Sequence, residues 1–503
     1  MGEWITTAIE SMCAWVWSPA LVLLCLAAGL YFSLRTRFVQ VRRFREMVRL
    51  LFWSGSAKSA GECKGVQGRV GISSFQAFAM ALSGRVGTGN IVGVATAIGY
   101  GGPGAIVWMW LIAFFGAGSA FVEATLAQIY KENHNGQFRG GPAYYIEKGL
   151  RSPLLGCVFA VLAALACGVF LPPVQCNGIA LSCSRSFGVE VWVIGLVVAT
   201  LIALVIIGGV KRIANVAQVV APVMAIVYIV LSLVVLVVHY DMVPDVFMQM
   251  LRGAVGVNEV TGAVLGTTIA WGVKRGIYSN EAGQGTGAIV AAAAKVSHPV
   301  KQGLVQAFSV YIDTLLVCTA TAMMILACKT YTIADEPGVF YTAAALGTVV
   351  GPRAGDMIVS IALFFFAFTT IMAYYYYAET NLVYLFNRWR RRIYKKHPER
   401  LEQLENEDLH FGDDRGEKIV VWALRIGTIG AVFIGSLAGS GVVWMVGDIG
   451  VGVMAWINVV TILFLSPKAL RTLRDYERQK KEGKEPVFDP VALEIDGVEY
   501  WKS

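Results

Sequence analysis

The stretch Gly84-Arg85-Val86-Gly87-Thr88-Gly89-Asn90 decides the fold of this chain, because it places glycines and polar residues inside an apolar segment of helix length. Such residues weaken a helix in lipid, and bare backbone at membrane depth is tolerated only where it is buried in protein or lines a cavity. A helix that is broken at the membrane midplane turns its free N–H and C=O groups toward a ligand. The stretch therefore predicts a transport site rather than a catalytic one.

The composition predicts an all-α polytopic membrane protein. The 503 residues are 56% hydrophobic and 15% charged, whereas a soluble domain is about half apolar and about a quarter charged. The nine Cys are scattered, without the spacing of a disulfide framework or a zinc site. The net charge of +8 arises from the connecting segments, so we expect no nucleic-acid partner.

Eleven stretches are long and apolar enough to cross a bilayer, which requires about 20 residues. Turn and breaker residues, such as Gly101-Gly102-Pro103 and Ser466-Pro467, mark most of their ends. The predicted spans are residues 14–35, 72–98, 103–130, 154–182, 190–209, 215–238, 259–294, 302–327, 356–386, 418–439 and 442–466.

The basic residues predict the orientation. Most of the 42 Lys and Arg residues lie in alternate connecting segments and in the C-terminal tail. The positive-inside rule then places the N-terminus outside and the C-terminus in the cytoplasm of a cell (inner) membrane protein. The predicted parts are residues 1–70 (first span and basic segment), 71–240 and 241–466 (two five-span halves, the second with a cytoplasmic loop at 388–417), and 467–503 (a soluble, partly flexible tail).

The span at 259–294 is too long and too rich in glycine for one straight helix. Gly272, Gly276, Gly283 and Gly285 each offer a break point. Two interrupted helices that open two halves of five spans each are typical of an inverted repeat. A short internal similarity, GTGNIV from Gly87 and GTGAIV from Gly285, agrees with that interpretation.

Four ionisable positions lie in or beside the spans: Arg85, Lys274-Arg275, Glu281 and Asp313. Charges at bilayer depth are costly and face a cavity or a partner. One interpretation is a gate or packing ion pair, such as Arg85 or Arg275 with Glu281, and the other is direct contact with the ligand. Asp313 and Glu281 are also the groups that a proton-coupled carrier would need.

Catalytic and energy-converting motifs are absent from the sequence. It contains no Walker string, no metal-spaced His/Cys/Asp/Glu cluster and no nucleophile with a local base. We therefore expect no enzyme. A channel would carry current unrelated to substrate stoichiometry, and a nutrient sensor would need an output domain beyond the short tail.

Several motifs, in this order, resemble the alanine or glycine:cation symporter family, the sodium:alanine symporters. The resemblance covers about residues 15–470 and implies a leucine-transporter-like 5+5 inverted-repeat fold with one extra N-terminal helix. It also implies sodium-coupled uptake of alanine, glycine or a similar small neutral amino acid. We expect the protein to be a monomer. The motifs are Phe75–Ala77, Gly87–Ile98, Gly101–Ala105, Trp108–Trp110, Gly140–Pro142, Trp271–Gly276 and Ser279–Gly283.

In such a fold, the unwound backbone offers N–H groups to the substrate carboxylate at a half-helix N-terminus. Carbonyls near Trp271-Gly272 would accept the ammonium group, and Trp271 would either wall the side-chain pocket or pack in the core. The expected substrate-binding residues are Thr88, Gly89, Asn90, Gln175, Asn177, Trp271 and Gly272.

Sodium needs five or six oxygen ligands, which carbonyls and hydroxyls supply. The resemblance implies that Thr369 and Thr370 face the carbonyls before Gly87, so the expected sodium ligands are Gly87, Thr88, Thr369 and Thr370. The alternative for any such Thr is a hydrogen bond to a carbonyl of its own helix.

One residue departs from the family pattern. Gln284 stands where many members carry Met or Leu. It predicts either a larger polar substrate such as glutamine or a cytoplasmic gate. We therefore group Gln284 with Arg85, Arg275 and Glu281 as residues of gating or specificity.

Overall fold

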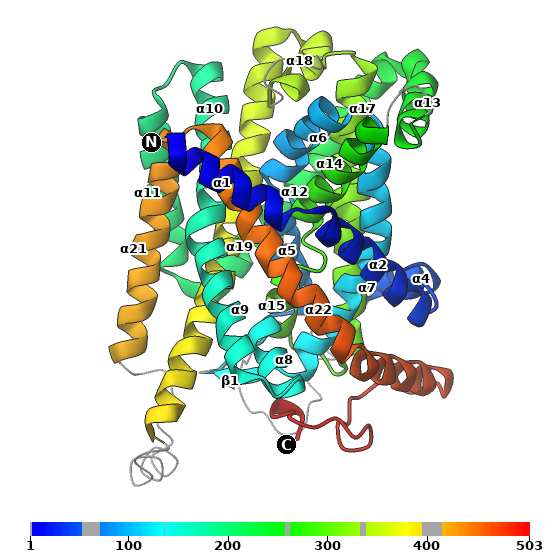
Figure 1. Cartoon of the computed structure of the whole chain (residues 1–503), viewed down its shortest axis with the longest axis vertical. Helices are drawn as coiled ribbons and strands as arrows, with labels where there is room; N and C mark the ends of the chain where they lie inside the picture. The colour runs from blue at the N-terminus through cyan, green and yellow to red at the C-terminus, as the bar shows by residue number, and fades with distance from the viewer. Residues whose placement is uncertain are drawn as a thin grey trace.

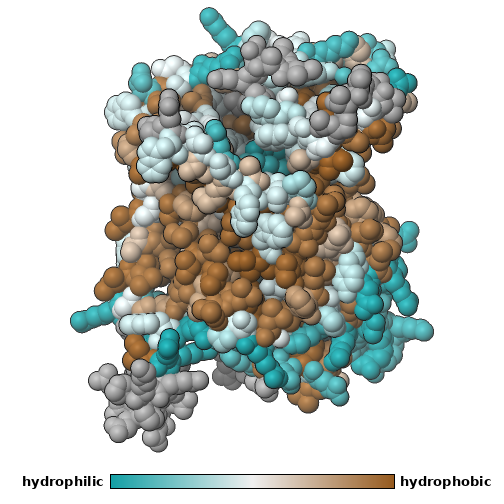
Figure 2. Space-filling model, viewed as in Figure 1, coloured by the Kyte–Doolittle hydropathy of each residue, from teal (hydrophilic) through white to brown (hydrophobic). Residues whose placement is uncertain are grey.

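The computed structural model describes residues 3–52, 71–134, 136–256, 262–331, 339–394 and 415–502. Its helices form a bundle, with the two chain ends toward opposite ends of the long axis (Figure 1). On the face shown in Figure 2, a hydrophobic belt surrounds the middle and hydrophilic residues gather at both ends. This distribution is that of a multi-pass membrane protein.

Eight helical segments in the described ranges are long and apolar enough to cross a membrane. They are built from α1 (Glu3–Val16) with α2 (Pro19–Arg35), α7 (Ala105–Ile129), α9 (Pro153–Leu165) with η2 (Ala166–Phe170) and α10 (Leu171–Phe187), α12 (Gly209–Val238), α16 (Pro299–Val310) with η4 (Tyr311–Cys318) and α17 (Thr319–Ala327), α19 (Pro352–Tyr394), α21 (Arg415–Leu437) and α22 (Ser440–Lys481).

The other elements are shorter. They are α3 (Val39–Arg42), α4 (Phe44–Phe52), α5 (Ser74–Arg85), η1 (Gly89–Gly93), α6 (Val94–Gly101), α8 (Pro142–Gly149), α11 (Val191–Ile206), η3 (Tyr240–Met242), α13 (Val243–Ala254), α14 (Gly262–Asn280), α15 (Thr286–Ala293), α18 (Val339–Val350) and η5 (Tyr500–Lys502). Strands β1 (Glu132–His134) and β2 (Gln137–Arg139) pair antiparallel as a small hairpin.

Two of the predicted spans consist of two short helices with a break between them. The first break separates α5 from η1 and α6, and the second separates α14 from α15. The breaks adjoin each other, since Arg85 Nε at the end of α5 donates a hydrogen bond of 2.7 Å to the carbonyl of Asn280 at the end of α14. Helix α14 packs against α6, and α15 packs against α5 (Figure 1). The predicted break within Gly84–Asn90 is thus present.

The second break lies at residues 281–285, and the prediction that Gly272 or Gly276 interrupts the helix is wrong. Both glycines lie inside α14, where they allow it to approach α7 closely. A Cβ on Gly272 would collide with the carbonyl oxygen of Ala105, and one on Gly276 would collide with Ile112. The break itself uses Gly283 and Gly285, whose φ values of +86° and +88° favour glycine.

We expect Gly272→Ala to lower the free energy of unfolding by about 1–3 kcal/mol, because overpacking a tight contact forces the backbone to move. Gly266→Ala is the matched control in the same helix, since no atom lies within 4 Å of its added Cβ. Thermal unfolding of the purified variants in detergent measures both. Equal melting temperatures for the two variants would contradict a packing role for Gly272.

The C-terminal boundary of the last span differs from the prediction. Helix α22 continues through Pro467 to Lys481, because neighbouring helices and Ser side chains re-satisfy the backbone around a proline in a membrane helix. The tail beyond it packs against the protein: Trp501 Nε1 donates to the Gln128 carbonyl at 2.9 Å, and the Phe488 N–H to the Ser297 carbonyl at 3.0 Å. The tail that was predicted to be partly flexible therefore begins as a helix, and its last part is held to the helix bundle by hydrogen bonds.

The cytoplasmic loop predicted at 388–417 begins later than expected. Helix α19 extends to Tyr394, and helix α21 begins at Arg415. Residues 395–414 lie outside the described residues, so most of the predicted loop is not part of this description.

Candidate functional site

At the first helix break, backbone N–H groups that have no partner within a helix donate hydrogen bonds to side-chain oxygens. The Gly87 N–H donates to Asn90 Oδ1 at 2.9 Å, and the Thr88 N–H donates to Gln175 Oε1 at 3.0 Å. All four residues are buried. Two amide oxygens thus accept from the N–H groups that the sequence analysis assigns to a substrate carboxylate, and one of them belongs to Gln175, a predicted substrate-binding residue.

Gly87 also has a steric reason to be glycine. A Cβ at this position would lie 2.5 Å from Thr370 Oγ1 and 2.7 Å from Gln175 Oε1. The break is therefore enclosed by α19 on one side and α10 on the other.

Thr370 brings its hydroxyl to the open end of α5. Its Oγ1 lies 2.8 Å from the Ser83 carbonyl oxygen, 3.2 Å from the Val86 carbonyl oxygen and 2.9 Å from the Phe366 carbonyl oxygen. Thr369 Oγ1 bonds only the Phe366 carbonyl, at 3.0 Å. Hydroxyl and carbonyl oxygens from two elements converge here, and this donor set fits a small hard cation. Among the described residues, no group of three or more His, Cys, Asp or Glu could hold a metal ion.

Three residues predicted to bind substrate lie elsewhere. Asn177 Nδ2 donates to the carbonyls of Gly435 and Ala438 at 3.0 and 2.8 Å, so it satisfies the C-terminal end of α21. Trp271 and Gly272 lie inside α14, about 12–14 Å along the helix from its last residue at about 1.5 Å per residue. Their carbonyls belong to a continuous helix and are not at a helix end.

Trp271 stacks on Tyr100, with ring centroids 4.8 Å apart. Tyr278, further along the same helix, is an aromatic residue that does lie close to the first break. A Cβ on Gly89 would lie 3.2 Å from Tyr278 Cδ1. The alternative in which Trp271 packs with its neighbours is therefore the one that the structure favours.

Arg85 does not form the predicted ion pair with Glu281. Besides Asn280, its guanidinium donates to Gln306 Oε1 at 3.2 Å and contacts Ser309 Oγ. Glu281 Oε2 accepts a hydrogen bond of 3.3 Å from the Tyr377 hydroxyl. Arg85 thus joins the C-terminal end of α14 to α16.

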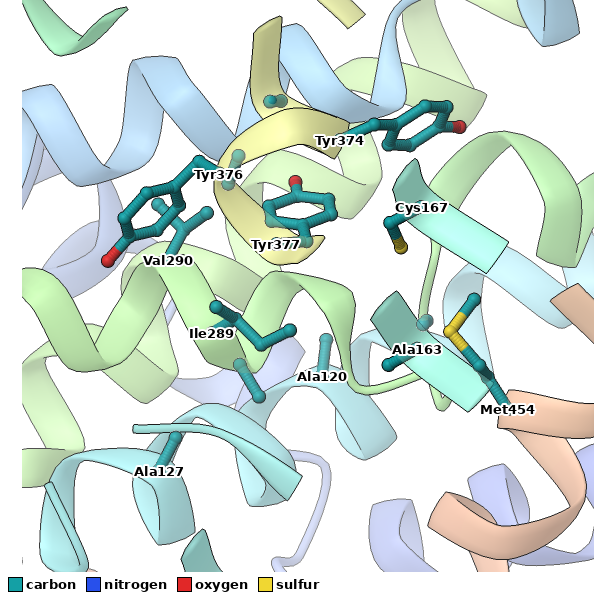
Figure 3. Packing of buried hydrophobic residues seen from close by; sticks show 14 of the residues in the cluster. Ala120, Ala127, Ala163, Cys167, Ile289, Val290, Tyr374, Tyr376, Tyr377 and Met454 are labelled. Carbon is teal, nitrogen blue, oxygen red and sulfur yellow. The ribbon is translucent and has the colours of Figure 1, made fainter. Parts of the chain in front are cut away.

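Gln284 lies in the second break, and its side chain folds back on α14. Its Nε2 donates to the Ile277 carbonyl at 2.5 Å, and its backbone N–H donates to the Glu281 carbonyl at 3.2 Å. Figure 3 shows the buried apolar layer in this region, with Tyr374 and Tyr377 of α19, Ile289 of α15 and Cys167 of η2. The side chain of Gln284 closes the end of α14.

Arg275 pairs with Asp448 of α22, not with Glu281. Its two terminal nitrogens lie 3.0 and 3.1 Å from the two Asp448 oxygens, and Lys274 Nζ lies 2.7 Å from Oδ2. The Arg275 and Asp448 side chains are 3% and 2% exposed. The guanidinium carbon also lies 4.8 Å from the ring centroid of Trp444 and 5.1 Å from that of Trp271.

Sequence analysis missed Asp448 and Glu123. Glu123 Oε2 accepts hydrogen bonds from the Gly285 N–H at 3.2 Å and from Asn458 Nδ2 at 2.9 Å, while Asn458 Nδ2 also donates to the Gly283 carbonyl at 2.9 Å. Glu123 and Asn458 therefore hold the second break from α7 and α22. The sequence does contain a signal for both residues, because an acidic residue inside an apolar span is unusual and indicates a polar partner or a site.

Comparison with known proteins identifies the family of this chain. The profile of the Sodium:alanine symporter family matches residues 2–397 and 410–490. YrbD of Bacillus subtilis, named as a candidate sodium/proton-dependent alanine carrier, is 47% identical over 98% of this chain and 97% of its own length.

Two further relatives carry names that differ in substrate. The "Sodium/proton-dependent alanine carrier protein" of Bacillus sp. strain PS3 is 42% identical over 87% of this chain and 96% of its own length. The "Probable sodium/glutamine symporter GlnT" of Bacillus subtilis is 39% identical over 97% of this chain and 94% of its own length. With a family profile that matches nearly the whole chain and several extensive relatives, this membrane-spanning chain belongs to the sodium:alanine symporter family.

Proposed function

We propose that the protein imports a small neutral amino acid, with alanine and glycine as its substrates, by symport with sodium. The observation that carries the proposal is the position of the Thr370 hydroxyl against the Ser83 and Val86 carbonyls at the first helix break. A sodium ion at this position would bridge α5 and α19, so its binding would favour one arrangement of these two helices. Such differential binding is what lets an ion shift a conformational equilibrium.

In this proposal the amino acid binds beside the first helix break. Its carboxylate would replace the Asn90 and Gln175 oxygens at the N–H groups of Gly87 and Thr88. Its ammonium group would bind carbonyls at the C-terminal end of α14, where the helix dipole is negative. Tyr278, which leaves little room at Gly89, would limit the length of the substrate side chain.

The helix arrangement supports a leucine-transporter-like architecture with eleven spans. Besides the eight long segments, α11 and the two broken pairs, α5–α6 and α14–α15, would complete the count. The end of α5 meets the end of α14, as two halves of opposite orientation require. The N-terminus would lie outside, the basic C-terminal tail in the cytoplasm, and the transporter would act as a monomer.

The energy available from sodium suffices for accumulation. One sodium ion that enters across 100 mV contributes about 2.3 kcal/mol. A tenfold sodium gradient adds about 1.4 kcal/mol. The sum corresponds to an amino-acid gradient of several hundredfold.

Glutamine is the second candidate substrate, because one relative is named for it. The geometry of Gln284 favours alanine and glycine, since its amide is bonded to Ile277 and does not line the proposed amino-acid position. Proton coupling is the second candidate for the cation, with Glu281 or Asp313 as its group, because both carboxylates are buried at the helix breaks.

Competition separates the substrates. Sodium-dependent uptake of labelled alanine into membrane vesicles is expected to be blocked by excess glycine and unaffected by glutamine. The Gln284→Leu variant is expected to show the same inhibition by glycine and the same lack of inhibition by glutamine. Inhibition by glutamine alone would show that Gln284 or its neighbours select a larger polar substrate.

A further inference from the structure

A cavity of about 880 Å³ lies where the last turns of α19 meet α8 and the first turns of α9. These helices pack together at the end of the bundle that also holds the C-terminal tail, since Lys148 of α8 lies 3.2 Å from Glu499 (Figure 1). This is the end that is proposed to face the cytoplasm. Helix α9 contributes Pro153 and Cys157 to the lining, and α19 contributes Trp389 and three arginines.

The three arginines line the cavity from one face of α19. Arg391 and Arg392 follow Arg388 by three and four residues, a spacing that brings side chains together on a helix. Arg388 forms an ion pair with Glu147, and Nη2 of the 54% exposed Arg391 lies 3.3 Å from Glu132 Oε2. These two glutamates are the acidic residues of the lining, so its positive charges outnumber its negative ones.

Both glutamates have further donors, which leaves arginine charge available for another anion. Glu147 also accepts a hydrogen bond from the Tyr384 hydroxyl, and Glu132 Oε1 lies 2.7 Å from Lys148 Nζ. Among the described residues, no acidic side chain forms an ion pair with Arg392. A guanidinium has five N–H donors, and pairs of them match the oxygens of a phosphate group. The lining therefore fits a phosphate.

The cavity adjoins a surface that faces lipid. Four residues form an apolar stripe along α9, each between 42% and 77% exposed: Leu154, Val158, Val161 and Leu165. The stripe starts at the cavity, because Pro153 and Cys157 of the lining directly precede its first two members. Since α9 belongs to a membrane-spanning segment, the stripe is available to acyl chains. The 59% exposed Trp389 has the ring that is typical of the membrane–water interface.

We propose that this cavity binds the head group of an anionic phospholipid such as phosphatidylglycerol. The lipid phosphate would accept hydrogen bonds from Arg391 and Arg392, and an acyl chain would lie along the stripe on α9. A soluble phosphate compound would leave that stripe unused. Anionic lipids attract basic residues at the membrane surface, and the cavity adds a defined position for one of them. The bound lipid would join α9 to α19, the helix that carries Thr370.

The test measures lipid affinity by native mass spectrometry of the purified full-length protein in detergent. Phosphatidylglycerol and phosphatidylcholine with identical acyl chains are titrated separately. The natural protein is expected to bind phosphatidylglycerol about tenfold more tightly than phosphatidylcholine, or better. The double substitution Arg391→Gln and Arg392→Gln is expected to weaken phosphatidylglycerol binding by about tenfold or more, because it removes two charges next to the phosphate. Inorganic phosphate at the same concentrations should not displace the lipid.

The double substitution Arg45→Gln and Arg49→Gln is the matched control. It removes two exposed charges from α4, at the same end of the bundle, where Glu46 lies 3.2 Å from Lys480 near the end of α22. Its affinity for phosphatidylglycerol should stay within about twofold of the natural value, since neither arginine lines the cavity. If the Arg391 and Arg392 double variant does not fold, Arg392→Gln alone removes an exposed charge and should weaken binding by about threefold or more.

Four results would overturn the inference. They are equal affinity for the two lipids, equal phosphatidylglycerol affinity of the two double variants, natural affinity of Arg392→Gln, and displacement of the lipid by inorganic phosphate at similar concentration. The last result would make a soluble phosphate the ligand of the cavity. The measurement uses neither alanine nor sodium, so its outcome is independent of the proposed symport.

Discussion

Thr370→Ala is expected to abolish sodium-driven uptake of alanine. The substitution removes the hydroxyl that lies 2.8 Å from the Ser83 carbonyl and 3.2 Å from the Val86 carbonyl, and with it one oxygen ligand of the proposed ion. Polar interactions with a charged group contribute about 1.5–3 kcal/mol, which corresponds to about 10- to 150-fold in sodium affinity. The measurement is alanine uptake in proteoliposomes as a function of sodium concentration. Thr370→Ala should take up almost no alanine at the sodium concentration that gives half-maximal uptake in the natural protein.

Thr370→Ser is the matched control, because it retains the hydroxyl and removes only a methyl group. It should keep sodium activation within a few-fold of the natural protein. Thr369→Ala should have a smaller effect than Thr370→Ala, since the Thr369 hydroxyl bonds only the Phe366 carbonyl of its own helix. Normal sodium activation of Thr370→Ala would show that the Thr370 hydroxyl is not a sodium ligand.

Asp448→Asn is expected to destabilise the protein severely. The substitution leaves Arg275, whose side chain is 3% exposed, and Lys274 without their shared carboxylate. Removal of one partner from a buried ion pair costs about 3–5 kcal/mol, a large part of the about 5–15 kcal/mol that keeps a typical protein folded. We expect a low yield of monodisperse protein and a strongly lowered melting temperature in detergent.

The same chemical change at an exposed ion pair serves as the control. Asp496 lies 3.3 Å from Arg151, and both side chains are 80% exposed. Exposed pairs contribute about 0–1 kcal/mol, so Asp496→Asn should melt close to the natural protein. Equal stability of the two variants would show that the Arg275–Asp448 pair does not hold α14 to α22.

The first helix break was predictable because its cause is local. Gly87 and Asn90 lie close together in the sequence, and their effect on a membrane helix requires no knowledge of a partner. The proposed sodium position at Thr370 could be expected only from the family resemblance, because Thr370 and Ser83 are far apart in the chain. Gln175 was predicted, together with Asn177, to complete the polar shell around the substrate, and it lies at the break.

The errors concern residues whose role depends on a neighbouring helix. A glycine in a long helix can break it or let another helix approach, and only the position of Ala105 shows that Gly272 does the latter. Asn177 was expected at the substrate, but it is turned toward the end of α21. The partner of Arg275 was missed because Asp448, a lone acidic residue in an apolar span, was not considered.

The most direct test of the account is the accumulation of labelled alanine in proteoliposomes that contain the purified protein and face an imposed inward sodium gradient, at equal pH on both sides. The account predicts accumulation above the external alanine concentration, its loss when the sodium gradient is collapsed, and its absence from liposomes with Thr370→Ala. Accumulation driven by a proton gradient, with none driven by sodium, would contradict the central claim and make Glu281 and Asp313 the coupling residues.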